Sequence, residues 1–163
     1  DAHHVEPALG VVRVRPFNHT GNGRPDSFVE SSLARQLVEI ALGRRAPRLE
    51  VGNLDAVRDF LDVDDVVGAY LRLLDRTVPG GVYNVASGVG RSVRELLETL
   101  FEITGVAPEK VEIAVEASRW RPTDHAIGDA SRLRSASGWA PRVPFHETLR
   151  ALAEGWRAKL TGS

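Results

Sequence analysis

Three segments of the chain combine turn-forming residues with polar side chains that suit the binding of a charged small molecule. Residues 15–21 read RPFNHTG, residues 52–65 read GNLDAVRDFLDVDD, and residues 119–124 read RWRPTD. Ligand pockets usually have a preformed shape on which a small number of polar groups converge. Rigid turns that carry one or two polar side chains each match that description. The three segments therefore predict a site for a charged small molecule.

Two other patterns fail on their spacing. His3 and His4 are adjacent in sequence, and adjacent histidines rarely face one ion, so no metal site is predicted. Residues 88–93 and 21–26 each begin with a Gly-x-Gly pair, but Val93 and Asp26 occupy the position of the third glycine. A dinucleotide-binding turn needs that glycine for close packing. Neither segment is expected to hold a dinucleotide.

Length and charge restrict the class of protein. The chain has 163 residues, of which 42% are hydrophobic and 26% charged, enough to form the core of one ordinary domain. Its formal net charge of -1 argues against nucleic acid as a partner, which requires an excess of positive charge. The absence of cysteine excludes disulfides and agrees with a cytoplasmic location. Because no apolar run approaches the roughly 20 residues of a membrane span, no membrane contact is predicted.

The elements that must position these residues alternate between strands and helices. Strands are expected near residues 11–15, 49–51, 58–61, 82–86 and 111–115, which are rich in β-branched and aromatic residues. Helices are expected near 28–42, 63–76, 93–104, 129–137 and 147–160, where apolar residues recur at helical spacing. Ser92 and Glu95 form a capping-box signature, and Asp62 can cap the helix that follows it. This alternation predicts an α/β fold with a parallel component.

Taken in order, these segments resemble the extended short-chain dehydrogenase/reductase family of sugar-nucleotide epimerases, dehydratases and reductases. Residues 82–88 (VYNVASG), the leucine-rich helix after them and residues 137–141 (SGWAP) extend the resemblance over nearly the whole chain. The branch of GDP-mannose 4,6-dehydratases and GDP-4-keto-6-deoxy-mannose reductases is the most similar. The resemblance implies the C-terminal part of such a protein: the last strands of the Rossmann sheet with the small substrate-binding domain. Residues 1–163 would then form one substrate-binding portion, without the dinucleotide-binding part.

The resemblance implies roles for residues of the first two segments. Asn18 would donate to the substrate near its diphosphate, and Pro16 and Phe17 would lie beside the nicotinamide of NAD or NADP. Arg58 would contact the diphosphate, which suits a planar guanidinium that grips phosphate oxygens with two parallel bonds.

The third segment would bind the other end of a nucleotide sugar. By the same resemblance, Arg121 and Asp124 would hold a phosphate and the ribose, whose hydroxyls a carboxylate accepts. Phe28, Val29 and residues 49–51 would line a base pocket, but their apolar side chains do not discriminate guanine from uracil or thymine.

Each of these polar residues also has a structural interpretation. Asn18 could support a turn, as asparagine often does. Arg58 and Asp59 could form a surface ion pair, and so could Arg121 and Asp124. Both interpretations remain open at the level of sequence.

The acid/base pair of the family is absent from the sequence. In the family, a tyrosine four residues before a lysine acts at the sugar carbonyl, and a glycine-rich turn holds the dinucleotide. Lys110 and Lys159 follow Val106 and Gly155 at that spacing, and Tyr70 and Tyr83 precede Leu74 and Ser87. No catalytic residue is therefore assigned, and the chain alone is expected neither to turn over substrate nor to bind the dinucleotide.

Three hypotheses follow. The first is the nucleotide-sugar-binding half of an NAD(P)-dependent reductase or dehydratase, and the second is a non-enzymatic nucleotide-sugar-binding or partner-docking module. The third is a relic without a site, because residues 21–23 (GNG) replace the family's Gly-Pro-Gly and Ser32 replaces a lysine common among dehydratases. The second departure favours a reductase. Without the first half of the fold, an apolar strand edge would be bare, so self-association or pairing with that missing half is expected.

Overall fold

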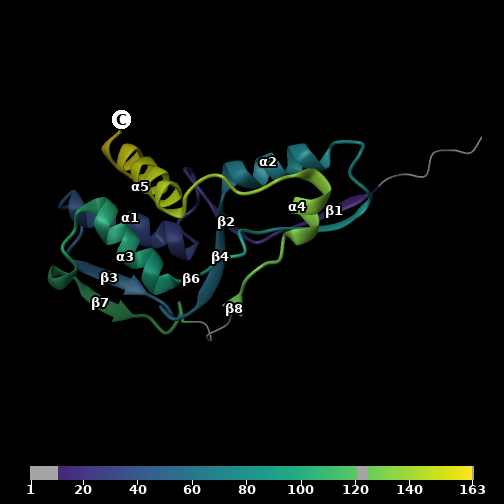
Figure 1. The fold of residues 1–163 in the computed structure, drawn as a ribbon. Coiled ribbons are helices and arrows are strands. Elements are labelled where there is room, and N and C mark those ends of the chain that lie inside the picture. The colour runs from purple at the N-terminus through teal and green to yellow at the C-terminus, as the bar shows by residue number, and fades with distance from the viewer. Residues whose placement is uncertain (1–10, 121–124, 163) are drawn as a thin grey trace, which may run out of the picture.

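The computed structural model of the chain describes residues 11–120 and 125–162. These residues form two groups of elements, one around strands β1 and β5 and the other around helices α1, α3 and α5 (Figure 1). Strand β4 (Val57–Asp62) lies between the groups and contributes to both. The helices and strands are mixed as the sequence predicts, which confirms the α/β class.

The first group is built on a parallel strand pair. Strand β1 (Val12–Pro16) pairs with β5 (Gly81–Val85), in register from Val12 opposite Gly81 to Pro16 opposite Val85. Helices α2 (Val63–Leu73) and α4 (Ser131–Ser137) pack against this pair through a shared core. That core contains Leu61, Val66, Ala69, Leu73, Tyr83, Val85, Leu133 and Trp139.

Strand β4 is the most connected strand. It pairs with β2 (Asn18–Thr20) and β8 (His125–Ala126) in parallel and with β6 (Gly90–Ser92) in antiparallel orientation. Residues 15–21 are predicted as a turn, but residues 18–20 of this segment form β2 in the structure, so the prediction is wrong there. The short segment becomes a strand because its backbone pairs with Phe60, Leu61 and Asp62, which no local pattern reveals.

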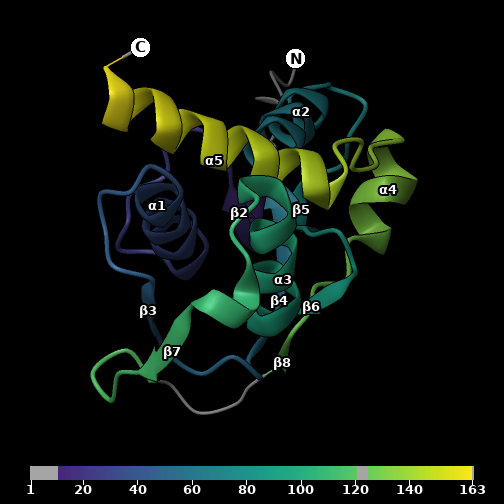
Figure 2. The same cartoon turned by 90° about the vertical axis from the view of Figure 1, so that its left-hand side faces the viewer.

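The second group combines three helices with a small sheet. Strand β3 (Arg48–Val51) pairs in parallel with β7 (Glu112–Val115), which follows the short 3₁₀ helix η1 (Pro108–Lys110). Helices α1 (Val29–Ala41) and α3 (Val93–Thr104) lie between this sheet and α5 (Phe145–Thr161), which crosses over both (Figure 2). The core of this group includes Leu33, Leu37, Leu49, Val51, Leu96, Leu100, Leu149 and Leu152.

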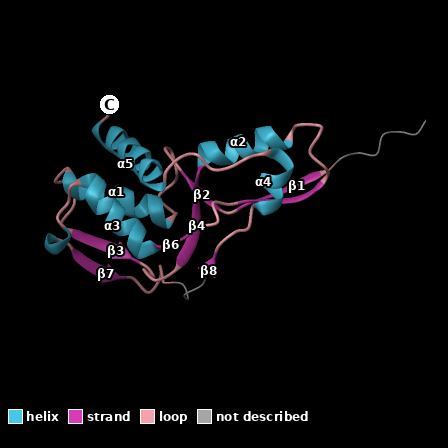
Figure 3. Ribbon diagram, viewed as in Figure 1, coloured by secondary structure: helices cyan, strands magenta, loops and turns pink. Residues whose placement is uncertain are grey.

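Two predicted helix caps are confirmed. The Ser92 side chain accepts from the backbone N–H of Glu95, and the Glu95 carboxylate accepts from the backbone N–H of Ser92, which completes the capping box of α3. The Asp62 carboxylate accepts from the backbone N–H of Asp64 at 2.8 Å and caps α2. These local signals set the helix starts seen in Figure 3.

The sequence pattern of α2 predicts one apolar face, and the structure buries only one of its members, Val66, in the core. The predicted face consists of Val63, Val66, Val67, Tyr70 and Leu74. Val66, Ala69 and Leu73 are buried in the core. Val63, Val67, Tyr70 and Leu74, which recur at helical spacing, are exposed together with Leu71. The apolar surface of the helix is thus wider than the part that the described residues cover.

No helix in the described ranges is both long enough and apolar enough to cross a bilayer.

Candidate functional site

A pocket of about 400 Å³ lies between the start of α1, the end of β3 and the segment that ends at Arg119. Its apolar wall is formed by Phe28, Val29, Leu33 and Val51. Three of these residues belong to the set that the sequence analysis expected to line a base pocket. The tertiary structure therefore brings residues 28–29 and the 48–51 strand to one hollow, as a base pocket requires.

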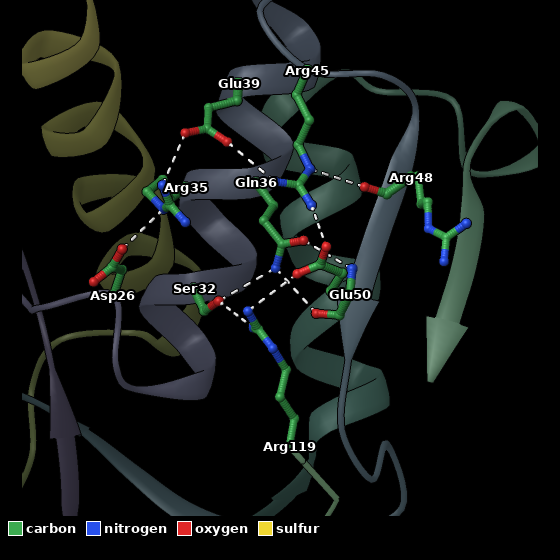
Figure 4. A network of polar contacts seen from close by, with 9 residues as sticks. All are labelled: Asp26, Ser32, Arg35, Gln36, Glu39, Arg45, Arg48, Glu50 and Arg119. Atoms are coloured by element: carbon green, nitrogen blue, oxygen red, sulfur yellow. Dashed lines mark hydrogen bonds and ion pairs between the residues drawn. The ribbon is translucent and has the colours of Figure 1, made fainter. Parts of the chain in front are cut away.

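The polar wall of this pocket is an ion-pair network (Figure 4). The Arg119 guanidinium donates from Nη1 to Ser32 Oγ at 3.0 Å and from Nη2 to Glu50 Oε2 at 3.3 Å. The other Glu50 oxygen lies 3.4 Å from Nη2 of Arg45. The Glu50 carboxylate is thus held between two guanidinium groups and lies at the pocket edge.

A buried amide fixes the backbone beneath this network. Gln36 on α1 is 1% exposed, and its side chain accepts from the backbone N–H of Glu50 at 2.9 Å and donates to the Glu50 carbonyl at 3.1 Å. It also donates to Ser32 Oγ at 3.3 Å. Because one amide satisfies both backbone groups of Glu50, it holds β3 against α1 as a further strand would.

Gly52 permits the close approach of the Arg119 backbone to the end of β3. A Cβ atom on residue 52 would lie 2.4 Å from the carbonyl oxygen of Arg119, a distance at which the backbone must shift. The glycine that opens the second polar segment therefore has a steric function: it admits Arg119 to the pocket.

The predicted residues Pro16, Phe17 and Asn18 line a second pocket of about 340 Å³, together with His19 and Arg24. Asn18 is exposed on β2, opposite Phe60 of β4. The Phe17 backbone N–H donates to the Val85 carbonyl at 2.9 Å, which ties this corner to β5. The Asn18 side chain is thus presented at a strand, instead of only supporting a turn.

Arg58 is half-buried on β4, where its Nη1 donates to the Val57 carbonyl at 2.9 Å. Alternate residues of a strand share a face, so Arg58 and Phe60 lie on the same face of β4. Asn18 of β2 lies opposite Phe60, so it belongs to that face as well. Two residues along a strand span roughly 7 Å. The fold therefore brings Arg58 and Asn18 to one face, although Arg58 is not among the described lining residues of either pocket.

Asp59 has a different environment from Arg58. It is 0% exposed and accepts hydrogen bonds from Ser87 Oγ, from the backbone N–H groups of Ser87 and Gly88, and from that of Gly128. Its carboxylate therefore serves the core, and the interpretation of residues 58 and 59 as a simple surface pair is not what the structure shows.

Arg121 and Asp124 lie outside the described residues, so their predicted roles remain predictions. The described neighbours on either side reach both parts of the site. Arg119 lines the first pocket, and β8 pairs with β4, Ala126 opposite Arg58. His3 and His4 also lie outside the described ranges, within which no group of three or more carboxylate or histidine side chains is placed to hold a metal ion.

Arg24, which is not predicted from the sequence as a site residue, connects the two pockets. Its guanidinium lies 3.4 Å from the ring centroid of Phe28, and its Nε lies 3.2 Å from Glu30 Oε1. Arg24 lines the second pocket and Phe28 the first. Burial of Glu30 raises the pKa of its carboxyl, an effect that Arg24 counteracts only in part. An arginine directly after a Gly-x-Gly turn was the available signal, although turns alone do not single out such a residue.

Solved structures with the same fold define the class of protein. The chain superposes on a Pseudomonas aeruginosa structure described as RMD complexed with NADPH, with a TM-score of 0.84 and 43% identity over 92% of this chain and 49% of that one. It also superposes on the Thermus thermophilus UDP-glucose 4-epimerase in complex with NAD, with a TM-score of 0.72 and 26% identity, over 91% of this chain and 47% of that one. These are Rossmann-fold extended short-chain dehydrogenase/reductase proteins, as the sequence motifs imply.

Within that class, the family model of GDP-mannose 4,6 dehydratase matches residues 2–152, and the chain belongs to this family. It is 43% identical over 152 residues to the GDP-6-deoxy-D-mannose reductase of Pseudomonas aeruginosa, covering 92% of this chain and 49% of the relative. It is 32% identical over 139 residues to GDP-mannose 4,6 dehydratase 2 of Arabidopsis thaliana, covering 85% of this chain and 37% of the relative. The chain thus spans about half or less of the length of these curated relatives.

Proposed function

We propose that this chain is the nucleotide-sugar-binding half of an NAD(P)-dependent reductase or dehydratase and that it binds a GDP-linked hexose. The observation that carries the proposal is the pocket between α1, β3 and Arg119, in which apolar walls meet a polar network. The 43% identity to a GDP-6-deoxy-D-mannose reductase supports the guanine nucleotide and favours the reductase branch.

In this proposal the ligand extends from the first pocket to the second. The base lies against Phe28 in the first pocket, and the sugar lies near Asn18 in the second. Arg58 binds the diphosphate, and Arg121 and Asp124 bind a phosphate and the ribose. A guanidinium and an amide donate to phosphate oxygens, and a carboxylate accepts from ribose hydroxyls.

The residues of this chain provide only part of a dinucleotide-binding site. Pro16 and Phe17 form an open wall at the second pocket and would lie beside a nicotinamide, which supplies hydride chemistry when bound. Neither Gly-x-Gly segment carries the third glycine of a pyrophosphate-binding turn, and neither tyrosine precedes a lysine by four residues. We therefore assign this chain no proton transfer, and we expect it to bind substrate without turnover.

A partner-docking function is the second candidate, and the exposed face of α2 favours it. Val63, Val67, Tyr70, Leu71 and Leu74 are 38% to 78% exposed, and they form one apolar stripe. Among the described residues, β1 and β5 pair only with each other, which leaves strand edges open. We propose that this side pairs with a dinucleotide-binding half or, in its absence, with a second copy. A cytoplasmic location also remains a prediction.

Calorimetric titration of the 163-residue chain with GDP-mannose and GDP tests the binding function. We expect saturable binding of both, weakened about tenfold or more by Asn18→Ala or Arg58→Ala through loss of hydrogen bonds to charged oxygens. Arg48→Ala is the matched control, because its 52% exposed side chain pairs with Glu112 away from both pockets. A folded sample that binds neither ligand would exclude the proposal. Oxidation of NADPH by the chain alone would contradict the expectation that the chain binds substrate without turnover.

A further inference from the structure

The Glu50–Arg119 pair places hydrogen-bond acceptors and donors side by side in the first pocket, next to its apolar wall. A carboxylate has about four acceptor positions, and the Glu50 carboxylate uses one for Arg45 and one for Arg119. A guanidinium has five N–H donors, and Arg119 uses one for Ser32 and one for Glu50. Both groups therefore retain capacity for a ligand that enters between the apolar walls.

The remaining acceptor positions of Glu50 and the remaining donors of Arg119 match the hydrogen-bonding edge of guanine. Guanine presents the O6 acceptor, and beside it the N1–H and N2–H donors, whereas adenine presents an amino donor in place of O6. A carboxylate can accept from the two adjacent guanine donors, and an arginine that donates to O6 is a recurrent contact in guanine recognition. Uracil offers only one N–H, so it leaves one carboxylate position without a partner.

We propose that Glu50 and Arg119 determine the nucleobase: Glu50 accepts from N1–H and N2–H of guanine, and Arg119 donates to O6. The inference rests on the proposed function, because it specifies the base at the same site. It assigns the discrimination to two side chains, whereas the apolar residues of the pocket hold any base.

The surroundings of the pair give it the rigidity that discrimination needs. Gln36 holds the Glu50 backbone on both of its polar groups, and Arg45 holds the carboxylate from the side opposite Arg119. Gly52 lets the Arg119 backbone lie against the end of β3. A polar group that is fixed in place cannot turn to satisfy a base with the wrong edge, so the mismatch leaves it unpaired.

The test compares GDP, IDP, ADP and UDP by calorimetric titration. IDP carries hypoxanthine, which keeps O6 and N1–H but lacks the 2-amino group. We expect the wild-type chain to bind GDP about tenfold more tightly than IDP, and ADP and UDP still more weakly. In Glu50→Gln an amide donor replaces one acceptor, so the preference of GDP over IDP is expected to disappear.

A second variant distinguishes the contribution of Arg119 to base preference from that of Glu50. Arg119→Met removes the donor to O6, which GDP and IDP share, so both should weaken by a similar factor while their ratio stays. The same variant should reduce the preference for GDP over ADP. Glu112→Gln is the matched control, because its carboxylate forms an ion pair with Arg48 on the neighbouring strand and does not line the pocket. Circular dichroism and urea unfolding confirm that each variant is folded.

The outcomes separate this inference from the function on which it rests. If the folded chain binds none of the four nucleotides, the proposed function fails and the inference with it. If it binds them without preference for guanine, or if Glu50→Gln keeps the wild-type ratio of GDP to IDP, nucleotide binding stands and base selection by this pair is overturned.

Discussion

Asp59 illustrates how one side chain in the middle of a binding motif serves the fold. Its Oδ1 accepts from the backbone N–H and Oγ of Ser87, at 2.9 and 2.6 Å, and its Oδ2 accepts from the N–H groups of Gly88 and Gly128, at 2.9 and 3.2 Å. The carboxylate thereby ties β4 to the loop after β5 and to the segment before α4. Arg58, its neighbour along the strand, lies on the opposite face and donates to the Val57 carbonyl.

Replacement of Asp59 by asparagine should destabilise the fold strongly. The buried amide NH₂ would face the N–H groups of Gly88 and Gly128, the second of which is also buried. Unsatisfied buried groups cost about 1–3 kcal/mol each, so we expect a loss of roughly 2–5 kcal/mol. Urea unfolding monitored by circular dichroism measures it. Asp75→Asn is the control, because Asp75 accepts from Thr77 in an exposed turn and its replacement should cost much less. Equal losses in the two variants would contradict the role of Asp59.

Glu30 makes the stability depend on pH. It is 2% exposed, and burial raises the pKa of its carboxyl above the ordinary value of 4.5. The folded state therefore binds a proton more tightly than the unfolded chain does, so this group's contribution to stability decreases as the pH rises from about 4.5 through the raised pKa.

Glu30→Gln should remove that decrease. We expect the free energy of unfolding of the wild type, relative to the variant, to fall between pH 4 and pH 7. Urea unfolding at both pH values gives this difference. Glu112→Gln serves as the control, because the Glu112 side chain is 64% exposed. A relative stability that stays constant or increases with pH would show that burial of Glu30 does not govern this dependence.

At the scale of elements, the contact between α1 and β3 depends on the Gln36 amide. The strand pairs with β7 along one edge, and Gln36 satisfies the backbone N–H and carbonyl of Glu50 along the other. The Gln36 side chain of α1 thus takes the place of a neighbouring strand at this edge of β3. The pocket lined by Phe28, Glu50 and Arg119 lies where these two elements meet, so its shape depends on that contact.

Gln36→Leu tests the contact between the two elements. The apolar side chain leaves both backbone groups of Glu50 without their partner, and we expect a loss of about 2–4 kcal/mol in urea unfolding together with weaker GDP binding. Ser32→Ala removes a hydroxyl that bonds Gln36 and Arg119 but keeps the Gln36–Glu50 contact, so its loss of stability should be smaller. A Gln36→Leu chain with unchanged stability would refute this account.

At the scale of the whole molecule, the two groups of elements differ in how well they are covered. In the second group, α5 crosses over α1 and α3 (Figure 2), whereas the first group exposes the outer face of α2. An uncovered apolar stripe beside open strand edges favours association.

We expect sedimentation equilibrium to detect self-association of the isolated chain that increases with concentration. Leu71→Lys combined with Leu74→Lys should reduce it by placing charges on the exposed face, where these residues are 65% and 78% exposed. Val115→Lys is the control, since Val115 is 63% exposed on β7, away from α2. A folded monomer at every concentration would rule out association through this face.

The sequence by itself determined the elements that local signals encode. The Ser92–Glu95 capping box and the Asp62 cap set the starts of α3 and α2, and β-branched runs marked β1, β5 and β7. The ordered motifs also determined the family, since their spacing along the chain is itself a sequence property.

Only the tertiary structure decided what depends on contacts between distant segments. Strand β2 exists because residues 18–20 pair with β4, and the exposed face of α2 follows from which side the core occupies. In the pocket, Arg119 contacts Ser32 and Glu50, which precede it by 87 and 69 residues along the chain. Periodicity and turn signals act over a few residues, whereas the partners of a guanidinium are set by packing of whole elements, and that is why the polar wall of the site emerged only from the fold.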